Sequence, residues 1–535
     1  MKTRLLRLTA LAFGHAATLG AAPAIAGVYN AASWTPTALP NSGVAQGAIF
    51  TVTGTGLGPA ALQQVQTYPL PTTQGLDGTT VQVTVGAVAV TCIMIYTVST
   101  QVAAILPSAT PVGTGTLTLS YQGGKSSIAI QVLAANFGTF TLNEGGTGPG
   151  VLTDTSYDAI TMINAAHPGD SLILWGTGLG AVTGDETEPP QEVDLGTGVQ
   201  VFVGNQPATM LYGGRSSSPG LDQINFLVPA GVTGCKTSVV VLVKGVTGNV
   251  TTMSVAPAGQ TTCGDTFNAL TSANLQKAVA SGSLNLGGVE LSRIAGGDDY
   301  LTADFASYPL NSLIRSYGGS FGPSIGSCLA YEVTGTSIVL ADPIQPSYLN
   351  AGPDLAITGP GGNKTVAASS TGSYPATLAI SPATYIEPGT YSVGNSSGGS
   401  NVAAFNWAMT LPSSVVPTNM PTRVNRAQNL TLTWTGSSEF SVVSIIGYSG
   451  VAATATVNSY VEFVCTANAS AGQFTVPSAI LNLLPAGGYG APTTPGVNLQ
   501  IAGIASNSFT VSGSPGLDTG FFTIFISNGS VAAIQ

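Results

Sequence analysis

The sequence Gly-Thr-Gly-Leu-Gly at residues 54–58 recurs at residues 176–180, 122 positions later, and both copies directly follow an apolar run. A second pair of matching segments keeps the same offset, because QVAAILP begins at Gln101 and QINFLVP begins at Gln223. Similarity that returns at one fixed offset indicates two copies of one domain in tandem. The chain therefore contains two related domains, and one interpretation serves both.

Short strand patterns fill the first copy. They are rich in Val, Ile, Thr and aromatic residues, are bounded by Gly, Pro or Ser, and lie at residues 48–53, 79–85, 87–96, 101–106, 115–121 and 126–132. Strands of this length, separated by turn residues, are typical of a β-sandwich. We therefore predict a β-sandwich for each copy.

Composition supports an all-β fold for the whole chain. Only 7% of the 535 residues are charged, against about 25% in ordinary globular proteins. We predict serial immunoglobulin-like β-sandwich domains with one short helix at residues 271–280. Thr271 can cap that helix, Leu275 and Ala278 have helical spacing, and Gly282 ends the pattern.

The length corresponds to three or four domains. A Pro-rich stretch after residue 411 is the predicted linker between the last two. We predict a signal peptide at 1–26, sandwich repeats at 27–135 and 136–263, a β-rich domain at 264–412, and a C-terminal immunoglobulin-like sandwich at 413–535.

The first 26 residues have the pattern of a cleavable signal peptide. Lys2, Arg4 and Arg7 form a basic start, an apolar stretch follows, and Ala24-Ile25-Ala26 is a cleavage site of the A-x-A type. The alternative is an uncleaved anchor. Cleavage leaves 10 Lys and Arg against 23 Asp and Glu, a balance that argues against a nucleic-acid partner. No later apolar run is long enough for a membrane span.

Five cysteines in an exported chain allow two disulfides and leave one thiol. We predict a bond between Cys235 and Cys263, which flank the last two strands of the second repeat. Cys328 with Cys465 is the weaker prediction, because these residues are expected in different domains. Cys92 lies in an apolar segment and is predicted to be a buried thiol.

The glycines of the repeated motif are predicted to be structural. They follow a strand at the point where the chain must turn, so a positive φ is expected at one or more of them: Gly54, Gly56, Gly58, Gly176, Gly178 and Gly180. A phosphate-binding loop is the alternative. It is disfavoured because no helix pattern follows and the spacing fits neither nucleotide-binding motif.

Several of these features together resemble a known family. They are Asn30-Ala31-Ala32-Ser33, the apolar run into GTGLG, VQVxVG, QxxxxxP and a closing strand pair. Over about residues 27–263 they look like the immunoglobulin-like IPT/TIG fold, and more closely like an uncharacterised domain family found in tandem in secreted bacterial proteins. The second copy departs from this pattern, because its Asn164-Ala165-Ala166-His167 lies much nearer to GTGLG. The resemblance implies a fold and brings no catalytic residues.

Few residues of the sequence are candidates for a catalytic, metal-binding or ligand-binding role. His167 is the only histidine after the signal segment, so any serine triad would have to use it, and we interpret it as a loop residue. Acidic residues at 185, 186 and 188 and at 298, 299 and 304 are candidate calcium ligands, with solvated loops as the alternative. Three of the four tryptophans lie in apolar strands, whereas Trp34 is predicted to be exposed.

We therefore predict an exported, non-enzymatic scaffold or adhesin-like protein at the cell surface or in the extracellular matrix, without a cofactor or a metal. Its partner would be a surface or matrix protein or polysaccharide. The first alternative is a carbohydrate-binding or enzyme-accessory protein. The second is a glycoside hydrolase with an acidic pair within 264–412, for which Asp298 and Asp304 are the candidates.

Overall fold

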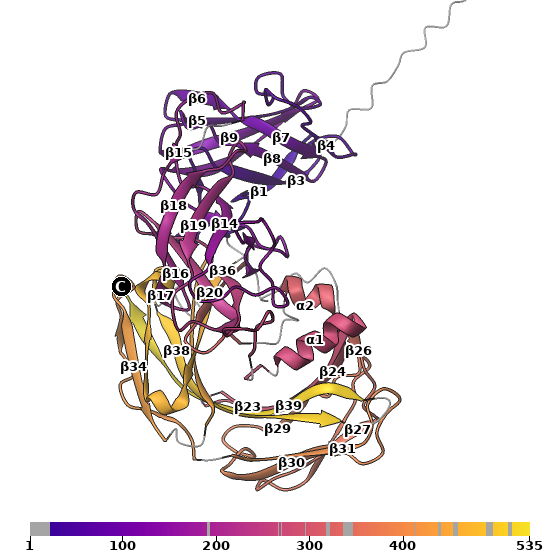
Figure 1. Cartoon of the computed structure of the whole chain (residues 1–535). Coiled ribbons are helices and arrows are strands. Elements are labelled where there is room, and N and C mark those ends of the chain that lie inside the picture. Colours follow the sequence, from indigo (N-terminus) through magenta and orange to yellow (C-terminus); the bar gives the residue numbers. More distant parts are fainter. Residues whose placement is uncertain are drawn as a thin grey trace, which may run out of the picture.

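The computed structural model describes residues 22–189, 193–265, 267–268, 270–294, 296–316, 322–334, 346–411, 413–436, 440–452, 458–487, 496–511 and 516–535. Most of the predicted signal peptide, residues 1–21, lies outside them. In Figure 1 one sandwich occupies one end of the molecule, a second sandwich lies in the middle, and a larger module fills the other end. Strands dominate all three parts, which confirms the predicted all-β class.

The first part is a sandwich of two five-stranded sheets. One sheet contains, in order, β1 (Ala24–Asn30), β3 (Ile49–Thr55), β8 (Gln101–Ile105), β7 (Ile93–Val98) and β4 (Gln63–Gln64). The other contains β2 (Val44–Ala45), β10 (Gly124–Leu133), β9 (Gly113–Tyr121), β5 (Thr79–Val85) and β6 (Val88–Thr91). Alternate side chains such as Phe50, Val52, Leu117 and Leu119 fill the space between the sheets.

One predicted strand of this sandwich is in fact two. Residues 87–96 were expected to be continuous, but β6 pairs with β5 in one sheet and β7 pairs with β8 in the other. The chain changes sheets at Cys92, which is fully buried between them. An apolar run that crosses from one sheet to the other remains buried throughout, so its composition does not mark the break.

The second part repeats this architecture with two six-stranded sheets. The first holds β11 (Gly138–Thr139), β14 (Ser171–Thr177), β19 (Asp222–Leu227), β18 (Thr209–Arg215) and β15 (Val193–Asp194), with β13 (Leu152–Thr153) beside β14. The second holds β12 (Gly148–Pro149), β22 (Thr251–Val255), β20 (Gly234–Val243), β16 (Val199–Val203) and β17 (Gln206–Pro207), with β21 (Val246–Thr247) beside β20.

The third part is built on one ten-stranded sheet. Its order is β25 (Cys328–Thr334), β36 (Asn458–Asn468), β35 (Val442–Ala452), β38 (Val497–Val511), β39 (Leu517–Ile534), β23 (Ser283–Arg293), β24 (Asp299–Pro309) and β26 (Ser347–Tyr348). Two short strands pair at its sides, β29 (Ala376–Ala379) with β24 and β33 (Arg423–Val424) with β39.

Two smaller sheets and the helices complete this module. One sheet holds β28 (Lys364–Ala367), β27 (Asp354–Thr358), β30 (Gly389–Asn395) and β31 (Phe405–Leu411), and the other holds β32 (Val416–Pro417), β34 (Leu430–Thr435) and β37 (Gln473–Val476). The helical segments are α1 (Ser272–Ser281), α2 (Leu310–Ser316), the 3-10 turn η1 (Ala469–Ala471) and α3 (Ser478–Leu481). Among the described residues, no helix has the length and apolar character needed to cross a membrane.

Helix α1 forms where the sequence predicts it, for the predicted reasons. The Thr271 side chain accepts a hydrogen bond from the backbone N–H of Asn274, which caps the helix. Gly282 adopts a left-handed conformation and donates its N–H to the carbonyl of Ala278. The buried Leu275 and Ala278 face the end of β23.

The predicted boundary between residues 412 and 413 does not separate two sheets. β23 pairs in parallel with β39, and β25 pairs antiparallel with β36, so four strands of the second predicted domain lie between strands of the first within one sheet. Cys328 lies directly opposite Cys465 in that ladder, and the two form a disulfide. The segments 264–412 and 413–535 therefore share one core. Pairing between strands more than 120 residues apart leaves no local signature that a composition shift could reveal.

The loop after β1 joins the first sandwich to this third module. Leu39 is 3% exposed and belongs to the core of the third module. Asn41 Nδ2 donates to Glu332 Oε1 at 2.7 Å. Glu332 Oε2 is buried and has no hydrogen-bond partner among the described residues. Burial raises the pKa of Glu332, although hydrogen bonds from Thr35 and Asn41 oppose that shift.

We predict that Glu332→Gln stabilises the protein at pH 7.5 by about 1–2 kcal/mol, because it removes a buried charge with one unsatisfied oxygen and keeps the acceptor for Asn41. A carboxyl whose folded pKa is raised costs stability when ionised, and this cost disappears as pH falls through the folded pKa. The gain in the denaturation midpoint should therefore shrink in acid. A loss of stability at pH 7.5 would contradict this account.

Candidate functional site

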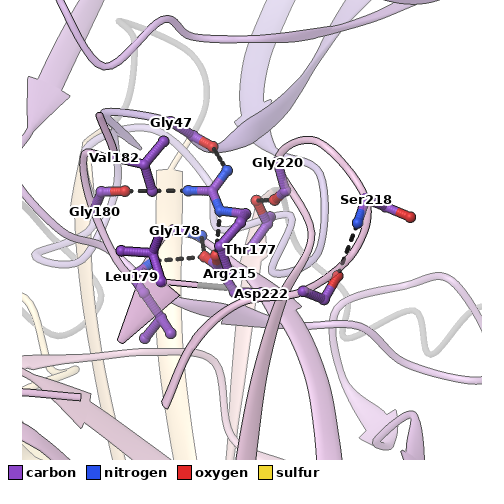
Figure 2. Close-up of polar contacts among 12 residues, drawn as sticks. Gly47, Thr177, Gly178, Leu179, Gly180, Val182, Arg215, Ser218, Gly220 and Asp222 are labelled. Carbon is purple, nitrogen blue, oxygen red and sulfur yellow. Dashed lines mark hydrogen bonds and ion pairs between the residues drawn. The ribbon is translucent and has the colours of Figure 1, made fainter. Parts of the chain in front are cut away.

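The second GTGLG loop lies at the joint between the two sandwiches, and a buried carboxylate accepts hydrogen bonds from its backbone N–H groups. Asp222, the first residue of β19, accepts hydrogen bonds from the backbone N–H of Gly178 at 2.7 Å and of Leu179 at 2.8 Å (Figure 2). The donors that would have to hold a phosphate are therefore engaged inside the protein. This geometry argues against the nucleotide alternative.

Arg215, the last residue of β18, extends this contact into the first sandwich. Its Nε lies 2.9 Å from Asp222 Oδ1, and both side chains are almost fully buried. Its two terminal nitrogens donate to the carbonyls of Gly47 at 2.9 Å and Gly180 at 3.2 Å, as Figure 2 shows. One guanidinium therefore links the loop, the β18–β19 hairpin and the neighbouring sandwich. Burial raises the pKa of Asp222 to about 6, while Arg215 and the two N–H groups oppose the shift.

Further polar contacts cross the same joint. Thr177 Oγ1 accepts from the N–H of Ile49 at 2.8 Å and donates to the carbonyl of Gly220 at 2.6 Å. Asn30, from the Asn-Ala-Ala-Ser segment, donates to the carbonyls of Asn136 and Thr177. The joint is therefore held by directed hydrogen bonds rather than by apolar contact alone.

The first GTGLG loop has no such carboxylate. Its Leu57 and Gly54 donate their N–H groups to the backbone carbonyls of Ser99 and Thr100, in the tight turn between β7 and β8. Counted from the matching Gln101 and Gln223, Thr100 corresponds to Asp222. The ion pair is thus specific to the GTGLG loop that lies at the joint between the two sandwiches.

The six glycines of the two loops serve two structural needs. φ is positive at Gly56, Gly178 and Gly180, as expected at turns. At the other three a Cβ would meet a neighbouring atom at 2.1–2.2 Å, and these are Gly54 against Ala24, Gly58 against Thr97 and Gly176 against Phe137. Gly178 combines both needs: its φ is positive, and a Cβ there would lie 2.1 Å from the carbonyl oxygen of Asn136.

The cysteines and the histidine have structural partners. Cys235 and Cys263 form a disulfide that ties β20 to the segment after β22. Burial raises the pKa of the Cys92 thiol far above its usual value, which keeps this thiol unreactive. His167 Nδ1 lies 3.3 Å from Asp170 Oδ2, and His167 Nε2 lies 2.7 Å from the carbonyl oxygen of Gln260. No serine contact of His167 is seen among the described residues.

The candidate calcium ligands do not converge. Glu186 accepts from the N–H and the hydroxyl of Ser108, so it belongs to the joint between the sandwiches. Asp185 binds Thr187 in its own loop. Within the part of the chain that the structure describes, no three His, Cys, Asp or Glu side chains are grouped as metal ligands.

The second acidic group is also structural. Asp299 is 1% exposed and binds the guanidinium of Arg293 and the N–H groups of Tyr385 and Ile386. Burial raises its pKa and these hydrogen bonds lower it, with a net decrease. Asp298 and Asp304 are six residues apart along an extended chain, about 20 Å. A glycosidase pair needs about 5–9.5 Å, so this pair does not fit that mechanism.

The tryptophan side chains are mainly packed against other residues rather than exposed for binding a ligand. Trp407 and Trp434 are each 3% exposed, and Trp407 stacks on Phe509 with ring centroids 5.3 Å apart. Trp34, predicted to be exposed, is half-buried and lies 5.7 Å from the ring of Tyr29.

A cavity lies between the second sandwich and the third module. This interdomain cleft has a volume of about 880 Å³. Gln200 and Gln206 line it from one side and Asn429 from the other, and the half-buried rings of Phe202 and Phe474 also contribute. Amides beside aromatic rings can bind polar, uncharged ligands. No sequence pattern predicted it, because its walls come from segments more than 200 residues apart.

Comparison with known proteins supports the fold assignment. Residues 36–133 match the model of the IPT/TIG domain. The resemblance to tandem immunoglobulin-like domains of this type is confirmed. No curated protein matches the sequence.

Several solved structures show distant similarity. Immunoglobulin domains 1–4 of Sidekick-1 share 9% identity over 96% of this chain and 99% of that chain, with a TM-score of 0.13. SGBP-B of the mixed-linkage glucan utilization locus of Bacteroides ovatus shares 13% identity over 87% of this chain and 94% of that chain, with a TM-score of 0.15. Invasin, a bacterial integrin-binding protein, shares 10% identity over 89% of this chain and 75% of that chain, with a TM-score of 0.13. Similarity at these scores carries no inference about function.

We predict that Asp222→Asn lowers the free energy of unfolding by about 3–5 kcal/mol, because it leaves the Arg215 charge buried without its partner. Chemical denaturation of the full chain measures this loss. Glu144→Gln is the matched control, because Glu144 pairs with Arg315 at the surface and should change stability by less than about 1 kcal/mol. Equal effects of the two substitutions would show that the joint contributes no more than a surface pair.

Proposed function

We propose that this chain is an exported, non-enzymatic scaffold or adhesin-like protein that acts at the cell surface or in the extracellular matrix. The observation that carries the proposal is the joint at Arg215 and Asp222, which fixes one sandwich against the next. A fixed joint between domains suits a protein that must hold a binding surface at a defined distance and orientation. Its partner would be a protein or a polysaccharide.

Other features support an extracellular setting. Two disulfides form, and such bonds persist in oxidising compartments. The acidic residues that suggested chemistry mostly bind backbone N–H groups, hydroxyls or arginine. The cores of the two sandwiches consist of packed apolar side chains. Activity would therefore depend on surfaces rather than on an enclosed reaction centre.

The start of β1 is compatible with signal cleavage after Ala26. β1 pairs with β3, and the ladder has an irregularity between Ile25 and Gly27. Removal of the residues before Gly27 would leave Gly27–Asn30 paired with β3.

We expect the chain, when expressed in a bacterium, to be recovered outside the cytoplasm with Gly27 as its first residue. N-terminal sequencing and intact mass measure this, and Leu11→Arg, which places a charge in the apolar stretch, should retain the protein inside.

Beads coated with the mature chain should then adhere to the cells that produce it, and the soluble mature chain should compete with the beads for this adhesion. Recovery of the chain only in the cytoplasm with Met1 intact, or adhesion unaffected by the competitor, would refute the proposal.

Carbohydrate binding is a second candidate function, favoured by the interdomain cleft with its amides and aromatic rings. Gln200 and Gln206 are exposed on its wall, so their replacement should not disturb the core. If the cleft holds a glycan, Gln200→Ala and Gln206→Ala should each weaken binding on a glycan array roughly tenfold, as loss of a hydrogen bond to a ligand does. Gln64→Ala, at an exposed site in the first sandwich, is the matched control. An array without signal for the wild type would exclude this function.

A further inference from the structure

The two faces of the ten-stranded sheet are covered differently. One face packs against the smaller sheets, where Trp407 lies near Phe305 and Val289 and Leu291 are fully buried. On the opposite face, α1 and α2 cover only the end at Leu284 and Leu286. Figure 1 shows the helices on one side of β23 and β39, and β30 and β31 on the other.

Beyond the helices this second face is hollowed. A cavity of about 430 Å³ lies over it, and we call the surface that lines it the inner face, with Glu290, Ile446, Glu462, Ile504, Phe521 and Phe525 as its main residues. They come from five strands, and the strand registers place them all on the same side of the sheet. Apart from the buried Ile504, the described segments leave the main residues of this apolar and aromatic surface half-buried.

Both carboxylates of the inner face lie beside aromatic rings. Glu462 pairs across the sheet with Tyr331 on one side and Tyr448 on the other. Glu290 pairs with Thr523, whose neighbours on the same face are Phe521 and Phe525. Gly288 allows this arrangement, because a Cβ there would lie 2.8 Å from the Phe521 ring.

No basic side chain of the described segments compensates these carboxylates. Lys, Arg and His are absent from the described residues that line the cavity. Glu462 has no ion pair or side-chain hydrogen bond among the residues described, and the one recorded contact of the Glu290 carboxyl is with Ser292 on its own strand. Burial raises the pKa of both groups. A cation placed there would gain a charge partner and an aromatic face together.

We propose that the inner face binds a cationic, amphipathic polypeptide segment in extended conformation, with its basic side chains at Glu290 and Glu462 and its apolar side chains on Ile446 and Ile504. The charge of the surface and its aromatic surroundings select a cation, and the apolar centre selects a chain with hydrophobic residues. The inference deepens the proposed binding role and rests on it, because it names the class of partner.

The strand register sets the length of this segment. Glu462 and Glu290 are separated by four strand spacings and by eight residues along the strands. Measured along the sheet this is roughly 30 Å. An extended chain of about ten residues spans that distance.

The test uses the purified mature chain and a fluorescein-labelled ten-residue peptide with lysine at both ends and alternating leucine and threonine between. Fluorescence anisotropy should show saturable binding, and the same peptide with glutamate at both ends should not bind. Glu290→Gln and Glu462→Gln should each weaken binding by about 5-fold to 10-fold. Both keep the side-chain shape, and thermal unfolding checks that each variant is folded.

Glu188→Gln is the matched control, because it removes the same charge from an exposed loop of the second sandwich, and it should change the affinity less than twofold. Absence of lysine-peptide binding, equal binding of both peptides, or an equal effect of all three substitutions would overturn the proposal. Because this measurement uses purified protein, its failure would not bear on export or adhesion. Export with Gly27 at the N-terminus and no peptide binding would leave the scaffold role intact and remove only this partner class.

Discussion

The buried pair of Arg215 and Asp222 is the interaction on which the arrangement of the first two domains depends. An ion pair without solvent contact carries a desolvation cost that only good geometry and further hydrogen bonds offset. The further hydrogen bonds are present here, because the carboxylate also accepts two backbone N–H groups and the guanidinium donates to two carbonyls. Since one of those carbonyls belongs to Gly47, the pair is satisfied only while the two sandwiches remain in contact. A local requirement for hydrogen bonds thus becomes a constraint on domain orientation.

The two GTGLG copies show how one loop acquires two roles. In each copy the glycines let the chain leave a strand, and in each copy the loop N–H groups need acceptors. The first copy uses the carbonyls of Ser99 and Thr100 in a tight turn. In the second copy the hairpin is longer, and a carboxylate instead of a backbone carbonyl accepts from the loop leucine, Leu179, and also from Gly178. The added charge then requires Arg215, and the arginine is long enough to reach the neighbouring domain. The longer turn with its carboxylate therefore distinguishes the loop at the joint from its counterpart in the first sandwich.

Sequence reasoning succeeded where the signal is local or repeated. The cap at Thr271, the stop at Gly282 and the spacing of Leu275 and Ala278 lie within twelve residues of one another, and helix α1 follows. The repeat identified the tandem sandwiches because both copies carry the same anchors. The ten-stranded sheet escaped prediction because its pairings, such as Glu290 with Thr523, join segments that share no pattern. The joint was missed as well, although Arg215 and Asp222 stand out as charges beside a strand in a chain with few of them.

That scarcity makes each charge informative. In a chain with 7% charged residues, solubility does not rest on an abundance of surface charge, so a charge retained near a core has a specific cause. Arg215, Asp222, Arg293 and Asp299 are each explained by a partner within the fold. Glu332 is explained in part, by Asn41 and the loop that it holds. Among the residues that the structure describes, Glu290 and Glu462 have no cationic partner, although they lie on a half-buried surface where an unpaired carboxylate is costly. Because Arg215, Asp222, Arg293 and Asp299 are paired within the fold, these two carboxylates are best understood as groups whose partner comes from another molecule.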